Sequence, residues 1–208
     1  MLENIIGGDF SHPGLKIRAG LPGLNPLLMS ICADRCGGYP LRQNITAIGE
    51  IMGREWRSNN SPGGEGAIIG IPRSGVPMGD GLRAAFPGYN YLLSNDGGDR
   101  VDGMPILPDD LIINEPNLLI ADSVIVTGTT VVLTLRAALS RARTVKRIVV
   151  FSAFAAVDGV ANLLDIFPGL EINIGAFAET RQNWDIHRWK SSVTLKGIPN
   201  FGELVSRP

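Results

Sequence analysis

An acidic residue followed by a run of small hydroxyl and glycine residues is the feature of this chain best suited to chemistry. Asp122 comes directly after the apolar run Leu118–Ala121, and residues 127–130 are Thr-Gly-Thr-Thr, with a helical pattern beginning at Val131. In α/β proteins ligands bind where parallel strands end, which is where this pattern puts the carboxylate. Backbone N–H groups and hydroxyls at a helix N-terminus bind anions. A carboxylate that could accept hydrogen bonds from ribose hydroxyls would then lie beside a binding site for a phosphate. The sequence therefore predicts a sugar-phosphate ligand.

A second pattern of strand, turn and helix places a cation beside glycine. The largely apolar run 68–71 is followed by Pro72, Arg73, Ser74 and Gly75. Small residues let backbone N–H groups approach an anion, and the Arg73 guanidinium supplies a planar fork of donors. The pattern predicts a second anion site. A solvated loop arginine here, and an ordinary strand-to-helix turn capped by threonines at 127–130, are the alternatives.

Together these two patterns resemble the phosphate-binding motifs of the phosphoribosyltransferases. In that family a strand, one or two acids and a Thr-Gly-Gly-Thr turn bind phosphoribosyl diphosphate (PRPP). The uracil phosphoribosyltransferases carry Asp-Pro where this chain has Asp122 and Ser123. The second glycine of the turn is Thr129 here, and a threonine would be strained if the turn requires positive φ at that position.

The run around Arg73 strengthens the resemblance to the uracil enzymes. Their corresponding loop is Leu-Arg-Ala-Gly-Leu-Gly-Met-Val-Asp-Gly, and five residues of this chain fall in register with it: Arg73, Gly75, Met78, Asp80 and Gly81. In the family this loop holds the diphosphate leaving group. Asp80 matches the family's acid, although it could equally cap or brace the helix.

The resemblance implies an activity, phosphoribosyl transfer in nucleotide salvage. A 5-phosphoribosyl group would pass from PRPP to a pyrimidine or related heterocyclic base, releasing diphosphate. Asp122 and Arg73 would be the catalytic residues. The implied 5′-phosphate ligands are Thr127, Gly128, Thr129 and Thr130, and the implied diphosphate ligands are Arg73, Ser74, Gly75 and Arg100. Mg²⁺ would come with PRPP, without direct protein ligands. The implied assembly is a homodimer or a higher homo-oligomer.

The C-terminal segment resembles the base-binding hood of the uracil enzymes less closely. Its implied base-binding residues are Leu195, Gly197 and Asn200. Lys196 replaces the family's proline, and Asn200 replaces an acid. Because base discrimination depends on a few hydrogen bonds, we expect the base not to be plain uracil.

The segment Glu179–Trp189 is longer than its counterpart in the uracil enzymes. Trp184 or Trp189 could stack on a larger ring, and Asp185 or Glu179 could contact exocyclic amines. An exposed loop or an oligomer contact is the alternative. His187 is a candidate general base, although a deprotonated ring nitrogen needs none.

Composition favours one soluble α/β domain over residues 1–208. The chain is 44% hydrophobic and 19% charged with a net charge of −1, so no bulk charge attracts nucleic acid. No apolar run approaches the ~18 residues that span a membrane, and the N-terminus lacks a signal-peptide pattern. Two cysteines, Cys32 and Cys36, with two histidines are too few for a structural zinc site, so we expect reduced thiols and a cytoplasmic protein.

The alternation of strands and helices predicts an α/β fold in which helices flank a parallel sheet. The family resemblance implies that this fold is of the type I phosphoribosyltransferase class. N-terminal helices over 25–35 and from Leu41 to Trp56 precede it, and a small hood over 178–208 follows. Residues 1–24 form an arm, and 94–116 an excursion over the site. Strands are expected at 67–71, 89–93, 117–125, 147–151 and 170–176, and helices at 75–86, 129–142 and 157–167. Arg73 and Asp122 should then follow neighbouring strands.

Two other functions remain open at this stage. One is a PRPP- or nucleotide-binding regulatory protein that has lost transferase activity, which Thr129, Asn200 and Leu204 would favour. The other is an unrelated hydrolase or kinase of sugar phosphates. A P-loop, a dinucleotide-binding fingerprint and a serine nucleophile elbow are all absent from the sequence.

Overall fold

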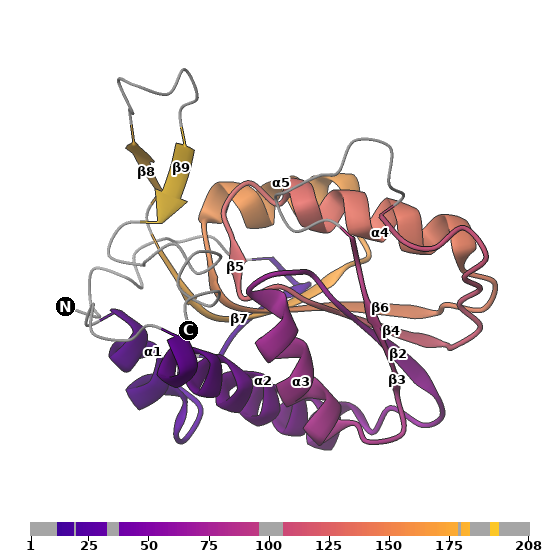
Figure 1. Cartoon of the computed structure of the whole chain (residues 1–208), viewed down its shortest axis with the longest axis horizontal. Helices are drawn as coiled ribbons and strands as arrows, with labels where there is room; N and C mark the ends of the chain where they lie inside the picture. The colour runs from indigo at the N-terminus through magenta and orange to yellow at the C-terminus, as the bar shows by residue number, and fades with distance from the viewer. Residues whose placement is uncertain are drawn as a thin grey trace.

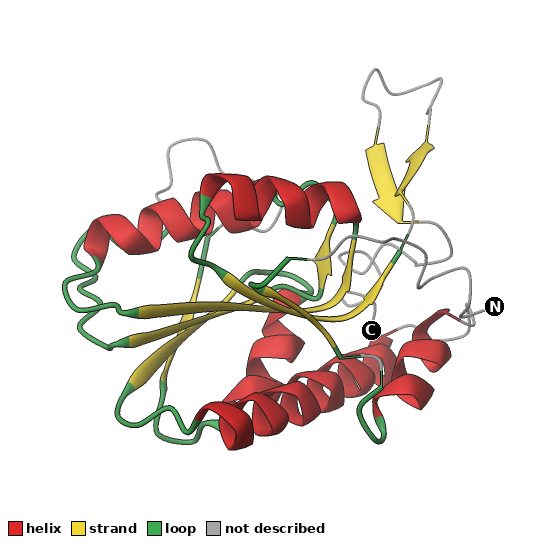
Figure 2. Ribbon diagram, turned by 180° about the vertical axis from the view of Figure 1, so that it is seen from behind, coloured by secondary structure: helices red, strands yellow, loops and turns green. Residues whose placement is uncertain are grey.

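A parallel sheet with helices on both faces forms the body of the protein (Figures 1 and 2). The computed structural model describes residues 12–18, 20–32, 38–95, 106–178, 180–183 and 192–195, the last two segments by their backbone alone. Three helices cover one face: α1 (Leu24–Cys32), α2 (Gly38–Asn60) and α3 (Gly75–Ala85). Two cover the other: α4 (Thr129–Arg141) and α5 (Val157–Ile166). The predicted fold class is confirmed.

The sheet order is β1-β7-β6-β4-β2-β3, and every neighbouring pair is parallel. The short β5 also pairs with β6. The strands are β1 (Leu15–Ile17), β2 (Gly66–Gly70), β3 (Asn90–Leu93), β4 (Asn117–Ala121), β5 (Val124–Ile125), β6 (Arg147–Ala155) and β7 (Glu171–Phe177). The carboxyl ends of all these strands therefore lie at one edge of the sheet.

The central strands are apolar throughout because both of their faces are buried. Along β2, Ile68 packs into the core beneath α1, α2 and α3, whereas Ala67 and Ile69 pack beneath α4 and α5. The predicted helix from Leu41 to Trp56 is confirmed within α2, where its apolar positions supply the sheet-facing stripe.

One predicted strand, 117–125, is interrupted in the structure. The segments β4 and β5 pair with β6 at the same offset, Ala121 with Phe151 and Val124 with Phe154. Residues 122 and 123 lie between them, outside both strands. The neighbour on the other side, β2, ends at Gly70 opposite Ala121. The interruption thus falls where the sheet loses one of the two strands that flank β4.

Two pairings were not anticipated. The strand β1 lies within the predicted arm 1–24 and pairs with β7, and the backbone N–H of Arg18 donates to the Ile174 carbonyl at 2.8 Å. An antiparallel hairpin, β8 (Thr180–Asn183) with β9 (Ser192–Leu195), stands apart from the sheet (Figure 1). Both involve strands of three or four residues, too short to show a period in the sequence.

The described parts of the predicted excursion, 94–95 and 106–116, contain no strand. Its base is closed by a hydrogen bond of 2.7 Å from the Asn95 N–H to the Ile106 carbonyl. The Arg141 guanidinium, at the end of α4, donates to the carbonyls of Leu107 and Pro108 and pairs with Asp109 at 2.8 Å. Residues 107–109 of the excursion are thus attached to the C-terminal end of α4.

Candidate functional site

Asp122 and Arg73 lie at the carboxyl ends of neighbouring parallel strands, as predicted. Gly70, the last residue of β2, pairs with Ala121, the last residue of β4. The Ile71 N–H continues the ladder by donating to the Ala121 carbonyl at 2.9 Å. Asp122 follows immediately on one strand, and Arg73 comes three residues after the end of the other, with its side chain exposed.

The loop after β2 is pressed against the backbone that carries Asp122. The peptide bond between Pro72 and Arg73 is cis. The Gly75 N–H donates to the Ile71 carbonyl at 2.9 Å, which closes the loop at the start of α3. A Cβ at position 75 would lie 2.3 Å from the Ala121 carbonyl oxygen and 3.2 Å from the Asp122 Cα. Only glycine allows this approach, so the loop lies in direct contact with the backbone of Ala121 and Asp122.

Burial dominates the electrostatics of Asp122. Only 9% of the residue is exposed, and this burial raises the pKa of its carboxyl to about 7. The Val124 N–H, 3.5 Å from Oδ1, opposes the rise because it stabilises the carboxylate. At neutral pH the side chain thus has access to both protonation states. Hydroxyl donors from a ligand would favour the ionised state.

The turn at 127–130 forms the start of α4, as an anion site requires. Gly128 is the N-cap with φ 76°, and Thr129 is already the first residue of the helix. The threonine in place of the family's second glycine is therefore not strained, since the turn uses positive φ one residue earlier. The Thr127 and Thr129 hydroxyl oxygens are 3.0 Å apart on the exposed side of this turn.

Helix α5 supports the turn from behind, which the sequence did not predict. The Asn162 side-chain amide donates to the Thr127 carbonyl at 3.0 Å. A Cβ at Gly159 would lie 2.4 Å from the Val126 carbonyl oxygen, and a Cβ at Gly128 would lie 2.9 Å from the Gly159 carbonyl oxygen. A glycine in the first turn of an otherwise ordinary helix was the one available signal for this contact.

Two buried serines also lie at this edge of the sheet. Ser123 is fully buried, and Ser94, which directly follows β3, is 2% exposed. The described residues offer no hydrogen-bond partner to either hydroxyl. Neither was assigned a role from the sequence, because a serine after a strand is common.

Other predicted site residues are placed in part or not at all. Arg100, Gly197 and Asn200 lie outside the described residues, as do Glu179 and 184–190. Leu195 is described by its backbone, which ends β9 and pairs with Thr180. Asp80 lies in the second turn of α3, so it does not cap that helix. Burial raises the pKa of its carboxyl, and the nearby Arg83 lowers it.

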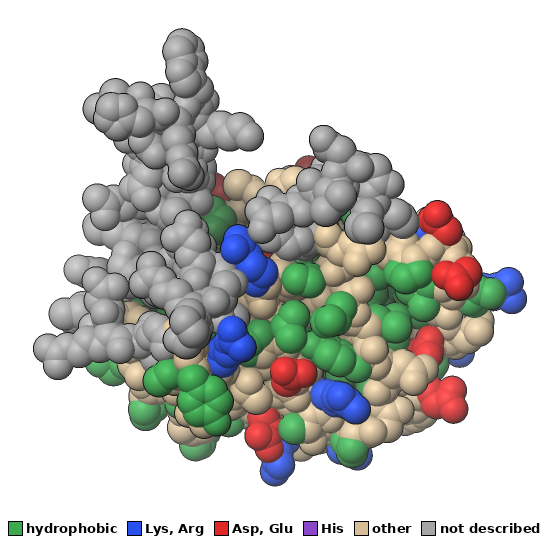
Figure 3. Space-filling view, in the orientation of Figure 1, with side chains coloured by type: hydrophobic (Ala, Val, Ile, Leu, Met, Phe, Trp, Pro, Cys, Tyr) green, Lys and Arg blue, Asp and Glu red, His purple; other side chains and the backbone are tan. Residues whose placement is uncertain are grey.

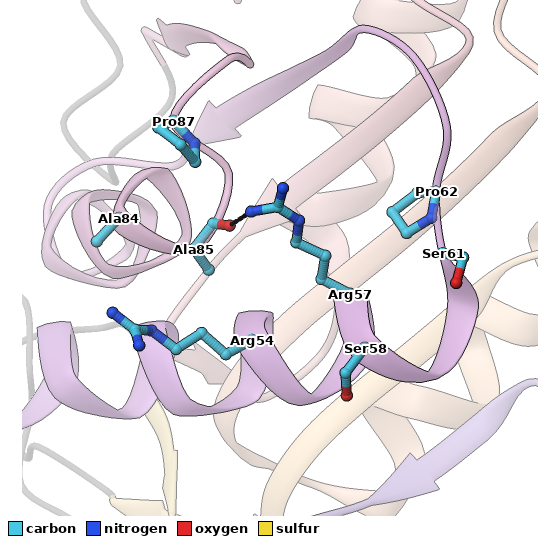
Figure 4. A pocket seen from close by; sticks show the side chains of 8 residues that line it. All are labelled: Arg54, Arg57, Ser58, Ser61, Pro62, Ala84, Ala85 and Pro87. Carbon is cyan, nitrogen blue, oxygen red and sulfur yellow. Dashed lines mark hydrogen bonds between the residues drawn. The ribbon is translucent and has the colours of Figure 1, made fainter.

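Two hollows in the described surface lie away from this edge. The first, about 630 Å³, holds Arg54 and Arg57 between the C-terminal ends of α2 and α3 (Figure 4). Arg57 donates to the Ala85 carbonyl at 2.8 Å, and Arg54 pairs with Glu50. Helix C-termini carry negative partial charge, so Arg57, in the last turn of α2 and bound to the last residue of α3, stabilises these helix ends.

The second hollow, about 720 Å³, lies at the amino ends of β1, β6 and β7. Its two arginines are already paired, Arg18 with Glu55 at 2.9 Å and Arg147 with Glu171 at 3.1 Å. Both hollows are at the wrong end of the sheet to join Asp122. On the face shown in Figure 3, basic and acidic side chains are interspersed.

The described residues hold no group of three metal-ligating side chains. Mg²⁺ commonly binds through one or two carboxylates plus substrate phosphates. Asp122 is the acid that the described residues place directly at the carboxyl end of β4. Among the described residues, this donor set fits a cation carried by a diphosphate. No described helix has the length and apolar character needed to cross a membrane.

Comparison with known proteins points to one family. The uracil phosphoribosyltransferase family model matches residues 41–202. A uracil phosphoribosyltransferase of Natronomonas pharaonis is 32% identical over 117 residues, which are 50% of this chain and 51% of that protein. The matched region thus spans about half the length of this curated relative.

Solved structures share the fold at low sequence identity. The AQ2163 protein of Aquifex aeolicus has a TM-score of 0.72 at 17% identity, covering 92% of this chain and 97% of that one. Adenine phosphoribosyl transferase of Trypanosoma brucei, solved with AMP, pyrophosphate and ribose-5-phosphate, has a TM-score of 0.53 at 14% identity, covering 78% and 84%.

Proposed function

Because the chain belongs to the uracil phosphoribosyltransferase family, we propose that it transfers the 5-phosphoribosyl group of PRPP to a nitrogen of a heterocyclic base and releases diphosphate. The observation that carries the proposal is the contact of Gly75 with the backbone of Ala121 and Asp122. It brings a cationic, glycine-containing loop against a buried carboxyl at two adjacent strand ends. The threonine turn at 127–130 follows the same strand, so the residues proposed to bind two anions and the sugar between them all lie at one edge of the sheet.

In the proposed reaction the bond from the ribose C1 to the diphosphate oxygen breaks, and a bond from C1 to a base nitrogen forms. The electron pair of the broken bond leaves with diphosphate, and positive charge develops on the sugar. The Asp122 carboxylate accepts hydrogen bonds from the ribose hydroxyls and stabilises that charge. A base that attacks as its nitrogen anion has already given its proton to solvent, so no general base is required.

The 5′-phosphate and the diphosphate of PRPP are bound by different parts of the proposed site. Backbone N–H groups at the start of α4, with the hydroxyls of Thr127, Thr129 and Thr130, bind the 5′-phosphate. Arg73, together with Ser74 and the Gly75 backbone, binds the diphosphate. When bound with PRPP, Mg²⁺ stabilises the charge of the departing diphosphate. Arg100 is proposed to reach the diphosphate from the excursion.

We propose a pyrimidine or related heterocycle other than plain uracil as the base. Support comes from the sequence of the hood, in which Lys196 and Asn200 replace family residues, and from the long segment between β8 and β9. Leu195, Gly197 and Asn200 are the proposed base contacts. Homo-oligomerisation, as a dimer or larger, is proposed from the family resemblance alone.

A diphosphate-release assay with PRPP, Mg²⁺ and a panel of heterocycles tests the proposal. Release that depends on the base, with a nucleotide of matching mass, is the expected result. PRPP binding without release under any base would indicate the regulatory alternative. Failure to bind PRPP would reject both.

The unstrained Thr129 removes one of the sequence features that favoured a protein without transferase activity.

A further inference from the structure

The side chain of Tyr91 reaches both ends of the loop that carries Arg73. It lies on β3, where its residue pairs with Ile68 of β2. Its hydroxyl donates to the Val76 carbonyl, in the first turn of α3, at 3.1 Å. Val76 is the second residue of α3, just after the loop, so this hydrogen bond attaches the loop's exit to the sheet.

The residue that precedes the loop also lies near the same hydroxyl. A Cβ on Gly70, the last residue before the loop, would lie 2.8 Å from the Tyr91 oxygen. A Cβ on Gly79, one turn into α3, would lie 2.6 Å from it. Two glycines therefore leave the space through which the phenol crosses from β3 to the start of α3.

The Tyr91 hydroxyl is suited to act as a permanent hydrogen-bond donor. Burial and the nearby Asp80 carboxylate raise the pKa of Tyr91 above its ordinary value, while Arg83 opposes the rise. The hydroxyl therefore keeps its proton across the physiological range. The Val76 carbonyl also accepts the ordinary helical bond from residue 80. Removing the phenolic hydroxyl leaves no orphaned carbonyl, so a small effect on global stability is expected.

We propose that Tyr91 is a positioning residue for the diphosphate loop, holding residues 71–75 in the geometry that binds the leaving group. The identity of the ligand rests on the proposed function. The residue touches no reacting atom. Its effect should therefore appear in affinity for diphosphate-bearing ligands and should be absent for ligands that avoid this loop.

Tyr89, two residues before Tyr91 in the chain, provides a matched control. Tyr89 precedes β3 and lies against Gly66 at the opposite end of β2, where a Cβ would be 2.0 Å from its ring. The described residues give its hydroxyl no hydrogen-bond partner. Tyr89→Phe removes the same atom as Tyr91→Phe, but far from the loop.

Calorimetric titration of wild type, Tyr91→Phe and Tyr89→Phe with diphosphate plus Mg²⁺ and with ribose 5-phosphate tests the proposal. One lost hydrogen bond predicts about three- to tenfold weaker diphosphate binding in Tyr91→Phe. Ribose 5-phosphate affinity should be unchanged in both variants. Equal diphosphate affinity in Tyr91→Phe and wild type, or equal weakening for both ligands, would overturn it.

Hydrogen exchange separates this proposal from the proposed function. Peptides covering 71–79 should exchange faster in unliganded Tyr91→Phe than in Tyr89→Phe, because the loop has lost its attachment. If the wild-type protein binds neither ligand, the proposed function fails, while faster exchange would still support the positioning role. Identical exchange in the two variants would reject that role whatever the ligand.

Discussion

Asp122 is a deeply buried carboxyl that would carry a negative charge when the hydroxyls of a sugar ligand donate to it. The Asp122→Asn variant keeps the size of the side chain and removes that charge. We expect PRPP affinity to fall about 10- to 100-fold, the equivalent of losing charged hydrogen bonds of ~1.5–3 kcal/mol. The variant should remain folded, since the carboxyl lies between β4 and β5 and outside the apolar strands. Titration with PRPP measures the effect, and unchanged affinity in a folded variant would remove Asp122 from the site.

The raised pKa of Asp122, about 7, predicts how stability depends on pH. In the unfolded chain this carboxyl loses its proton near its ordinary value of about 4. Between these two values the unfolded state is deprotonated while the folded state keeps the proton. The free energy of unfolding therefore falls as the pH rises through this window, and the loss persists above it.

Asparagine carries no such proton, so Asp122→Asn should gain stability relative to wild type as the pH rises. The gain between about pH 4 and pH 8 is at most about 4 kcal/mol, the free energy that corresponds to raising a pKa from about 4 to about 7. Urea denaturation of both unliganded proteins across this range measures it. A difference that stays constant with pH would show that the carboxyl is not buried as described.

At the scale of elements, the site depends on how closely helix α5 supports the threonine turn. Gly159→Ala would place a methyl group 2.4 Å from the Val126 carbonyl oxygen, so the turn or the helix must move. Overpacking of this kind costs about 1–3 kcal/mol. We expect lower thermal stability and weaker binding of ribose 5-phosphate, measured by calorimetry.

Gly169→Ala is the matched control for this substitution. A Cβ at position 169 meets nothing within 4 Å, and the residue precedes β7 away from the turn. It should change neither property. If Gly159→Ala behaves like Gly169→Ala, the contact between α5 and the turn does not constrain the phosphate site.

The elements that the sequence predicted are those with strong local signals. Continuous apolar runs marked β2, β4 and β6, and apolar spacing marked α2, because both kinds of element bury surface along their whole length. The strand β1 was missed because three residues carry no period and its partner β7 is distant in the sequence. The break between β4 and β5 was missed because it follows from where β2 ends, a tertiary feature.

The same distinction applies to the site. Asp122, Arg73 and the turn at 127–130 were recognisable by residue type and order. The supports behind them, Gly159 and Asn162, act through backbone contacts from another helix and have no local signature. Placement of Thr129 inside α4 likewise required the backbone geometry.

At the scale of the whole molecule, the central prediction concerns which base is accepted. The sheet edge that holds Asp122 and Arg73 has the family pattern, whereas the sequence after β7 departs from it at Lys196 and Asn200. We expect the base specificity to have changed while phosphoribosyl transfer is kept. Steady-state kinetics with uracil and other heterocycles check this. Turnover of uracil at ~1 per second or faster, with no base preferred over it, would contradict the prediction.

A crystal structure of the protein with PRPP tests most directly whether the carboxyl edge of the sheet is one site. The ribose hydroxyls should lie within hydrogen-bonding distance of the Asp122 carboxylate. The 5′-phosphate should lie against the turn at 127–130 and the diphosphate against the loop at 73–75. PRPP bound in either of the two hollows, or a sugar that does not contact Asp122, would contradict the assignment of this edge as the active site.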